Sequence, residues 1–250
     1  MPAYNAAQTL RRTYGDIPRD LVDRVILVDD GSSDETLQVA KDLGIEVFIH
    51  NRNYGYGANQ KTCYRESLRL GADIVVMLHP DYQYDPTLLP EMIAPIQEGR
   101  ADVVLGSRLM GISPMKQGMP WWKFAGNRLL TRFENWAFGL KLSEYHTGYR
   151  AYSRHALQSV NFEMNSDAFI FDQEIVAQFV CLQQRIVEIP VPTRYFAEAS
   201  SISFWNSALY GLSILRLLCW YLLHREQVWP QRSLDSLATR YGPAVSAQKS

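Results

Sequence analysis

The stretch Arg24-Val-Ile-Leu-Val-Asp-Asp-Gly-Ser-Ser-Asp34 decides the fold of this chain. Its first part is a short apolar run, which is typical of a buried strand. A glycine turn follows, in which a serine can cap a helix whose first turn is acidic. We expect that helix to run to about Leu43 and to stop at Gly44.

The same succession of strand and helix is repeated further along the chain. Strands are expected at 46–50, 73–78 and 102–106, and helices at 56–70 and from Pro86 onward. Repeated β-α units predict an α/β protein with a mostly parallel central sheet and helices on both faces. Ligands of such sheets bind at the carboxyl ends of the strands.

The chain starts with a turn-like run, Pro2-Ala-Tyr-Asn5. An α/β domain normally supplies a buried strand first, so we expect the first strand to be truncated. The alternative is a fold that begins with a loop and a helix. Met1 is not followed by basic and then apolar residues, so we expect no signal peptide.

The composition excludes several classes of protein. The chain has 250 residues, of which 47% are hydrophobic and 20% charged, so it is not mainly disordered. Cys63, Cys181 and Cys219 are too few and too far apart for a disulfide scaffold, and they fit a reducing compartment. The formal net charge of −1 argues against nucleic acid as a partner.

The charges are nevertheless arranged in blocks. Residues 1–102 carry a net charge of −6, residues 103–160 +6, residues 161–200 −4 and residues 201–250 +3. Of the 25 cations, 19 are arginines, whose planar fork suits phosphate and carboxylate oxygens. The blocks can be solvated faces that arose by chance, or they can mark sites for different partners.

Two polar loops are candidates for binding a nucleotide. Asp29 and Asp30 follow a strand, where carboxylates can accept hydrogen bonds from a base or ribose but repel a diphosphate. Asp34 is better explained as part of a capped turn. The loop 53–59 carries two glycines before a helix, so its backbone can approach an anionic ligand, although the motif alone is weak.

The segment His79-Pro-Asp-Tyr-Gln-Tyr-Asp85 follows the strand expected at 73–78. If the segment stays extended, His79, Asp81, Gln83 and Asp85 share one side. A carboxylate flanked by other donors suits Mg²⁺ or Mn²⁺ beside a diphosphate, so the first three are candidate metal ligands. The alternative is a polar loop in which Asp85 caps the next helix.

The basic block contains Arg108, Arg128 and Arg150, which together can bind an anionic group. Each arginine alone is more often a surface residue. Aromatic residues at 121–124 offer an apolar wall or a contact with a membrane surface.

The segment Phe204–Leu223 has twenty residues and a single charge, Arg216. It is long enough to span a bilayer, but the internal arginine disfavours a span. We favour an in-plane amphipathic helix on anionic lipid, over a buried or dimer-forming helix and over a true span. A homo-oligomer is therefore one possible state.

Taken in order, these motifs resemble the family-2 glycosyltransferases, and within them the dolichyl-phosphate mannose synthase-like (polyprenyl-phosphate glycosyltransferase) branch. The resemblance extends from Pro2 to about Phe196. It is carried by Pro2-Ala-Tyr-Asn5, Val28-Asp-Asp-Gly-Ser-Ser-Asp34, Asn53-x-Gly-x-Gly-Ala58, Gly106-Ser-Arg108 and Thr147-Gly-Tyr-Arg150.

The resemblance implies a GT-A fold in residues 1–196, followed by a membrane-associating helix and tail in 197–250. It implies that a nucleotide-diphosphate sugar is bound by residues at the start of the chain and by three aspartates and one glycine further along. It further implies an acceptor phosphate bound by the basic motifs, and catalytic roles for Asp81 and the three arginines. The donor residues are Pro2, Ala3, Tyr4, Asn5, Asp29, Asp30, Gly57 and Asp81, and the acceptor residues are Arg108, Arg128, Thr147 and Arg150.

The chain departs from the family at His79, where the family usually has the first Asp of Asp-x-Asp-x-Gln. His79, Asp81 and Gln83 can still bind Mn²⁺ or Mg²⁺, or metal binding can be weakened. The expected activity is metal-assisted, inverting sugar transfer to a polyprenyl phosphate, by a protein peripheral on the cytoplasmic face of a membrane.

Two other functions remain open. The acceptor can be a hydroxyl group of a polysaccharide or small molecule, which needs a general base, for which Asp172 and Glu174 are candidates. The protein can also be a non-catalytic nucleotide-sugar-binding homologue.

Overall fold

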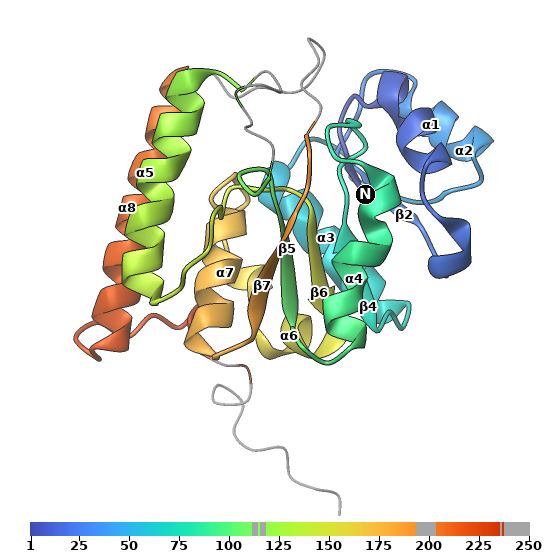
Figure 1. Ribbon diagram of the computed structural model, residues 1–250. Helices are drawn as coiled ribbons and strands as arrows, with labels where there is room; N and C mark the ends of the chain where they lie inside the picture. The colour runs from blue at the N-terminus through green and yellow to red at the C-terminus, as the bar shows by residue number, and fades with distance from the viewer. Residues whose placement is uncertain (112–114, 116–118, 194–203, 236, 238–250) are drawn as a thin grey trace, which may run out of the picture.

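Strands and helices alternate through most of the chain, as the sequence predicts. The computed structural model describes residues 1–111, 115, 119–193, 204–235 and 237 (Figure 1). The expected domain boundary at 196–197 and the end of the tail lie outside the described residues.

The elements are as follows. The strands are β1 (Pro2–Ala3), β2 (Ile26–Asp29), β3 (Glu46–Ile49), β4 (Ile74–Met77), β5 (Val103–Ser107), β6 (Arg150–Ser153) and β7 (Ile186–Pro190). The helices are α1 (Ala7–Gly15), α2 (Thr36–Asp42), α3 (Tyr56–Arg69), α4 (Leu89–Gln97), α5 (Trp121–Phe138), α6 (Arg154–Ser159), α7 (Phe171–Cys181) and α8 (Phe204–Arg225). Short 3₁₀ helices are η1 (Arg19–Leu21), η2 (Pro86–Leu88) and η3 (Phe162–Met164).

Local chemistry ends these helices where the sequence predicts. Gly44 and Gly71 follow α2 and α3 with φ of 67° and 91°, in the left-handed region that favours glycine. Asp85 caps η2, because its carboxylate accepts a hydrogen bond from the Thr87 backbone N–H at 3.1 Å. The interpretation of Asp85 as a helix cap is confirmed.

The strands form two sheets. In the first, β1, β2 and β3 are parallel in the order β1-β2-β3. In the second, ordered β4-β6-β5-β7, β5 and β7 are parallel, whereas β6 is antiparallel to both its neighbours. The prediction of a mostly parallel arrangement is confirmed, and the antiparallel β6 is an addition that the sequence did not predict.

The first strand is as short as expected. Pro2 pairs with Val28 and Ala3 with Asp29, so β1 covers only the carboxyl half of β2. The amino group of Met1 donates a hydrogen bond to the Ile26 carbonyl oxygen at 2.8 Å.

Helices cover both faces of the strands, as Figure 1 shows. Side chains alternate along β5: Val104 packs in a core shared with α1, α2 and α4. Val103 and Leu105 pack in a second core, shared with α3, α6 and α7. The prediction of helices on both faces is confirmed.

Helices α5 and α8 form an outer layer next to α7 (Figure 1). Ile214, Leu217 and Tyr221 of α8 are buried against α5 and α7 in a third core. Within the described residues, one helix, Ser207–Arg225, is long and apolar enough to cross a membrane. One side of that helix is packed against the protein.

Candidate active site

Several of the predicted site residues lie at or just after the carboxyl ends of strands, and direct contacts join these segments to one another and to α3 and α7. After β1, the Asn5 side-chain oxygen accepts a hydrogen bond from the Ser33 N–H at 2.9 Å. The Tyr56 ring at the start of α3 stacks on His79, which follows β4, with ring centroids 5.5 Å apart. The Tyr56 hydroxyl donates to Asp172 of α7 at 2.7 Å.

Asp30 organises the glycine-bearing loop. Its Oδ1 accepts a hydrogen bond from the Tyr54 N–H at 3.0 Å and lies 2.6 Å from His50 Nδ1. Its Oδ2 accepts from the Gly55 N–H at 2.9 Å. Both oxygens are engaged, so Asp30 holds the loop in place.

Asp29 is fully buried, and one of its carboxylate oxygens lacks a hydrogen bond within the described residues. Its Oδ2 accepts a hydrogen bond from the Ser32 N–H at 2.9 Å, whereas its Oδ1 has no hydrogen-bond partner within the described residues. A buried acceptor without a partner costs roughly 1–3 kcal/mol. An N–H group of a nucleobase is a suitable partner, and the 53% exposed Tyr4 lies on the neighbouring loop.

Gly55 and Gly57 of this loop lie against the backbone of residues 166–167. A Cβ on Gly55 would lie 2.7 Å from the Asp167 carbonyl oxygen, and a Cβ on Gly57 would lie 2.3 Å from the Ser166 carbonyl oxygen. The Gly57 N–H donates to the Asp167 carbonyl oxygen at 2.7 Å. The interpretation that these glycines let the loop approach an anionic ligand is therefore corrected, because residues 166–167 occupy that space.

The segment that follows β4 is not extended. Tyr82 has a φ of 58°, and its hydroxyl donates to Asp16 at 2.5 Å. Asp81 Oδ1 accepts a hydrogen bond from the Gln83 N–H at 3.1 Å across this turn. The condition for four alternating residues to share one side is not met, and Asp85 belongs to the cap of η2.

Asp81 and Gln83 keep oxygen atoms that suit a cation. Within the described residues, neither Asp81 Oδ2 nor the Gln83 side-chain amide forms a hydrogen bond. Burial lowers the pKa of His79, despite the neighbouring Asp81 and Asp172, so the imidazole is neutral and keeps a lone pair. An imidazole nitrogen, a carboxylate oxygen and an amide oxygen are ligand types that a divalent cation accepts beside the oxygens of a bound ligand.

This donor set is sparse, because the described part of the chain holds no group of three His, Cys, Asp or Glu that could bind a metal. The protein offers one imidazole, one carboxylate and one amide. Mg²⁺ typically uses one or two carboxylates together with substrate phosphates, so such a set is sufficient.

Asp172 is buried and contacts several polar side chains. Its carboxylate accepts hydrogen bonds from Tyr56 and from Gln60, the latter at 3.0 Å, and lies 3.8 Å from Arg150 Nη2. Glu174 accepts from the Ser166 N–H at 2.6 Å, and burial raises its pKa. Both oxygens of Asp172, and one oxygen of Glu174, therefore accept hydrogen bonds from the protein.

Arg150 is fully buried, contrary to the expectation of a phosphate contact. Its guanidinium donates hydrogen bonds to the carbonyl oxygens of Thr147, Tyr145 and Asp172 at 2.7–2.8 Å. These bonds fix the loop before β6 to the start of α7. The geometry supports a positioning role for Arg150.

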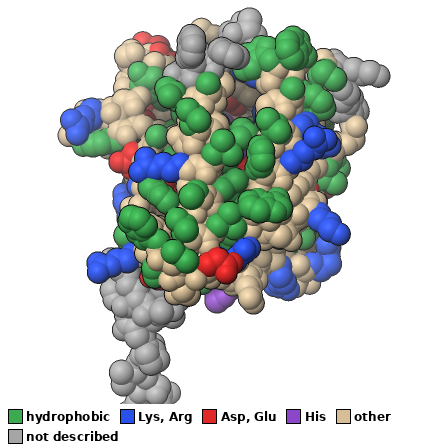
Figure 2. Space-filling model, turned by 90° about the vertical axis from the view of Figure 1, so that its left-hand side faces the viewer, with side chains coloured by type: hydrophobic (Ala, Val, Ile, Leu, Met, Phe, Trp, Pro, Cys, Tyr) green, Lys and Arg blue, Asp and Glu red, His purple; other side chains and the backbone are tan. Residues whose placement is uncertain are grey.

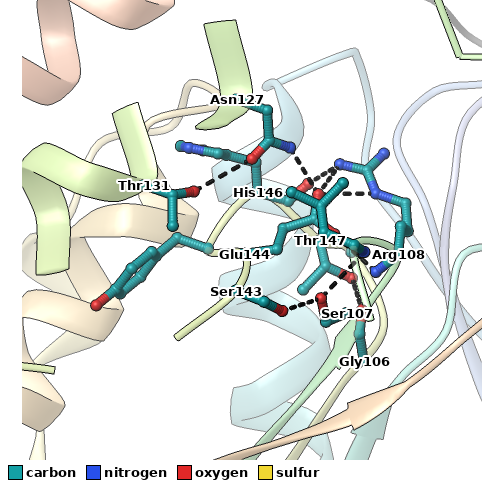
Figure 3. A network of polar contacts seen from close by, with 12 residues as sticks. Gly106, Ser107, Arg108, Asn127, Thr131, Ser143, Glu144, His146 and Thr147 are labelled. Atoms are coloured by element: carbon teal, nitrogen blue, oxygen red, sulfur yellow. Dashed lines mark hydrogen bonds and ion pairs between the residues drawn. The ribbon is translucent and has the colours of Figure 1, made fainter. Parts of the chain in front are cut away.

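Arg108 lies beside a buried carboxylate (Figure 3). Its backbone N–H donates to Glu144 at 2.7 Å, and its guanidinium donates to the other Glu144 oxygen and to the His146 carbonyl oxygen. Asn127 of α5 donates to the same carboxylate at 2.7 Å. Burial alone would raise the pKa of Glu144, but Arg108 and these hydrogen bonds outweigh it and lower that pKa.

The two remaining candidates for binding the acceptor phosphate, Thr147 and Arg128, lie in different surroundings. Thr147 is buried, and its hydroxyl donates to the Gly106 carbonyl oxygen at 2.5 Å. Arg128 is exposed on α5. The predicted arginines therefore do not form one cluster.

Lys123 of α5 is a further candidate, which the sequence reasoning missed. Partial burial, and after it the charge of Arg108, lowers the pKa of Lys123. Its position on α5, one helical turn before Asn127, was the only available signal.

The comparison of the sequence with known families decides the class of protein. The profile described as "Glycosyl transferase family 2" matches residues 1–160. The chain belongs to this family. It is a glycosyltransferase, and the family recognised from the sequence motifs is confirmed.

Curated relatives in the family include enzymes named for polyprenyl phosphates. The UDP-N-acetylglucosamine–dolichyl-phosphate N-acetylglucosaminyltransferase of Methanococcus voltae is 26% identical over 238 residues, which cover 87% of this chain and 94% of that protein. The undecaprenyl-phosphate mannosyltransferase of Micrococcus luteus is 26% identical over 241 residues, which cover 90% of this chain and 93% of that protein.

Solved structures show the fold. Glucosyl-3-phosphoglycerate synthase of Mycobacterium tuberculosis, crystallised with Mn²⁺, UDP and phosphoglyceric acid, matches with a TM-score of 0.65 and 19% identity. The match covers 90% of this chain and 76% of that chain. The chain therefore has the predicted GT-A fold.

Proposed function

We propose that this protein transfers a sugar from a nucleotide-diphosphate donor to a polyprenyl phosphate, with inversion at the anomeric carbon. The observation that carries the proposal is the outer face of α5 and α8. This face is largely apolar, the charged side chains that α5 and α8 themselves expose within the described residues are basic, and Asn127 of α5 donates to Glu144 beside Arg108.

The apolar side chains of this face are large and well exposed. On α5, Trp121 and Trp136 are 74% and 71% exposed, and on α8, Leu209 and Leu212 are 62% and 63% exposed. Figure 2 views the molecule from this side and shows the apolar side chains in contiguous groups. An exposed apolar surface of this kind marks an interaction site.

The charges on the two helices match an anionic lipid surface. Arg128, Arg132 and Arg216 are exposed, whereas the single acidic residue of α5, Glu134, is buried, and α8 contains no acidic residue. Basic side chains beside apolar ones favour helices that lie in the plane of an anionic membrane. This arrangement supports in-plane docking of α8 over a true span, since its other side packs on α5 and α7.

We call the part of the site around Asp29 and Asp81 the donor half, because it contains oxygen atoms that can accept hydrogen bonds or bind a metal beside a nucleotide sugar. We assign the base or ribose to Asp29 Oδ1 and to the loop of Tyr4 and Asn5. Mn²⁺ or Mg²⁺, held by His79, Asp81 and Gln83, would neutralise the donor diphosphate and stabilise it as a leaving group.

The acceptor half supplies cations for a lipid phosphate. Lys123 and Arg108 would orient the phosphate, with Arg128 at the membrane side. A phosphate oxygen attacks the anomeric carbon, the bond from that carbon to the diphosphate oxygen breaks, and the electron pair leaves with the nucleoside diphosphate. The attacking oxygen is already anionic near neutral pH, so this reaction needs no general base.

The reaction with a hydroxyl acceptor receives less support. It requires a general base, and the two candidates, Asp172 and Glu174, accept hydrogen bonds from buried protein groups. We further propose a peripheral position on the cytoplasmic face, where free thiols such as the exposed Cys219 remain reduced.

Transfer of radiolabelled sugar separates the possible functions. Nucleotide sugars are first screened by thermal shift with Mn²⁺, because a ligand that binds the native state raises the melting temperature. The selected donor is then incubated with the protein, with and without polyprenyl phosphate. Label that enters the lipid fraction only with the phosphate supports the proposal, and donor binding without any transfer would identify a non-catalytic homologue.

A further inference from the structure

The imidazole of His79 is held by the protein along one edge. Its Cδ2–Nε2 edge lies against Gly148, where an added Cβ would be 2.9 Å from Cδ2 and 3.0 Å from Nε2. Nε2 also lies 3.3 Å from the Tyr56 hydroxyl oxygen, and the two rings are nearly parallel, with an interplanar angle of 6°. A metal ion bound to Nε2 would therefore have to displace protein atoms.

The other nitrogen of the ring, Nδ1, has no such contact. Within the described part of the chain, the Tyr56 hydroxyl provides the only hydrogen bond to the His79 ring, and this bond is to Nε2. Nδ1 does not belong to the buried polar atoms that lack a partner, so it reaches the surface of the protein. Nδ1 is therefore the nitrogen that a ligand can approach.

The Tyr56 hydroxyl decides which nitrogen carries the proton. A tyrosine hydroxyl has one hydrogen, and Tyr56 donates it to Asp172 Oδ2 at 2.7 Å. Towards His79 the hydroxyl oxygen can therefore only accept, so the proton of the neutral imidazole lies on Nε2 and the lone pair on Nδ1. Gln60 donates to the other Asp172 oxygen at 3.0 Å, which keeps this carboxylate in place.

A nitrogen ligand changes the cation that a site prefers. Imidazole suits divalent first-row transition ions, whereas Mg²⁺ is bound best by oxygen ligands. Within the transition series, Mn²⁺ is the ion that also accepts carboxylate and carbonyl oxygens. The combination of His79 with the oxygen atoms of Asp81 and Gln83 is therefore better suited to Mn²⁺ than to Mg²⁺.

We propose that Tyr56, held by Asp172, is a positioning residue that fixes the tautomer of His79 and presents Nδ1 to the cation, and that the site thereby prefers Mn²⁺ to Mg²⁺. The inference rests on the metal role of His79 in the proposed function, and it adds the ligating atom, the supporting residue and the choice of ion. Partners at the far nitrogen of a ligating histidine typically change metal affinity by about 10–100-fold.

The first test determines the tautomer in the metal-free protein. The ¹⁵N NMR signals of an imidazole distinguish a protonated nitrogen from one with a lone pair, and the His79 signals are those that disappear in His79→Asp. We expect the proton on Nε2 in the unaltered protein and a mixture of both tautomers in Tyr56→Phe. Tyr54→Phe is the matched control and should leave the tautomer unchanged, because the Tyr54 hydroxyl donates to Asn51 at 2.7 Å. A lone pair on Nε2 in the unaltered protein would overturn the proposal.

The second test measures the binding of Mn²⁺ alone, from the electron paramagnetic resonance signal of the free ion, with Mg²⁺ as the competitor. Tyr56→Phe should weaken Mn²⁺ binding by about 10–100-fold, whereas Tyr54→Phe should leave it unchanged. His79→Asp should lower the preference for Mn²⁺ over Mg²⁺ by on the order of 10-fold. Equal Mn²⁺ affinities of Tyr56→Phe and the unaltered protein, or an unchanged preference in His79→Asp, would contradict the proposal.

The two tests also separate this inference from the proposed function. If Tyr56→Phe does not fold, the tautomer of the unaltered protein and the ion preference of His79→Asp still decide the question. Neither test uses the transfer reaction, so the positioning role of Tyr56 can fail while sugar transfer to polyprenyl phosphate stands. No binding of Mn²⁺ to the unaltered protein would overturn both the inference and the metal assistance in the proposed function.

Discussion

The proposed donor and acceptor halves of the site differ in how many of their charged atoms form contacts within the protein. In the donor half, Asp29 and Asp81 each keep a carboxylate oxygen without a hydrogen bond to the described protein. In the acceptor half, Arg108 is paired with the buried Glu144, and Arg150 donates to three backbone carbonyl oxygens. The difference teaches that a count of charges in the sequence does not measure the charge that a ligand can reach.

The largest expected effect of a substitution is at Arg150. Arg150→Met removes a fully buried cation, leaves three carbonyl oxygens without their donor and takes the positive charge away from the Asp172 carboxylate. We expect a loss of about 3–5 kcal/mol in the free energy of unfolding, measured by urea denaturation.

The matched control is Arg154→Met, since Arg154 is part-exposed and lies 3.9 Å from an exposed carboxylate of Asp73. That variant should lose less than about 1 kcal/mol. A stable Arg150→Met protein with a raised KM for lipid phosphate would restore the original phosphate-binding assignment.

A second prediction tests the available carboxylate of the donor half. Asp81→Asn should lower kcat by on the order of 10²–10³, because the diphosphate leaving group loses its charge stabilisation. Steady-state transfer across a Mn²⁺ titration measures the effect. Asp85→Asn, in the cap of η2, is the control and should retain most activity; full turnover by Asp81→Asn would show that the metal assignment is wrong.

A third prediction concerns the exposed arginines of α5. Replacing both Arg128 and Arg132 with Gln should weaken binding to anionic vesicles by about 30-fold, at about 1 kcal/mol for each charge near the surface. Co-sedimentation with vesicles at fixed ionic strength measures this change. The control replaces Arg11 and Arg24, which lie in or beside α1 and β2; vesicle binding that falls equally in both proteins would argue against this face.

The smallest expected effect is at Lys123. Lys123→Ala should raise the KM for lipid phosphate by about 10-fold, the lower end of the value of one charge-assisted hydrogen bond, and leave the KM for the donor unchanged. Lys141→Ala is the control, because Lys141 lies beyond the far end of α5, and that end is about 22 Å from Lys123 along the helix axis. An unchanged acceptor KM in Lys123→Ala would remove Lys123 from the acceptor site.

The features that the sequence predicted correctly depend on neighbouring residues. The strand, turn and helix around Asp29, the stops at Gly44 and Gly71, and the cap at Asp85 each follow from residues within one or two turns of each other. The family motifs then indicated the fold that the comparisons support.

The features that the sequence did not predict depend on distant contacts. Gly57 is small because residues 166–167 pack against it, more than one hundred residues away. Arg108 is neutralised by Glu144, and β6 enters between β4 and β5 from a later part of the chain. No spacing along the sequence carries that information.

The most direct test of the account compares two acceptors that differ only in the phosphate. The protein is incubated with labelled donor, Mn²⁺ and anionic vesicles that contain either polyprenyl phosphate or the free polyprenol. We expect label in the lipid fraction only with the phosphate, because the proposed reaction uses an anionic phosphate oxygen as nucleophile, whereas the two candidate bases for a hydroxyl accept hydrogen bonds from the protein. Equal or faster transfer to the free alcohol would contradict the account.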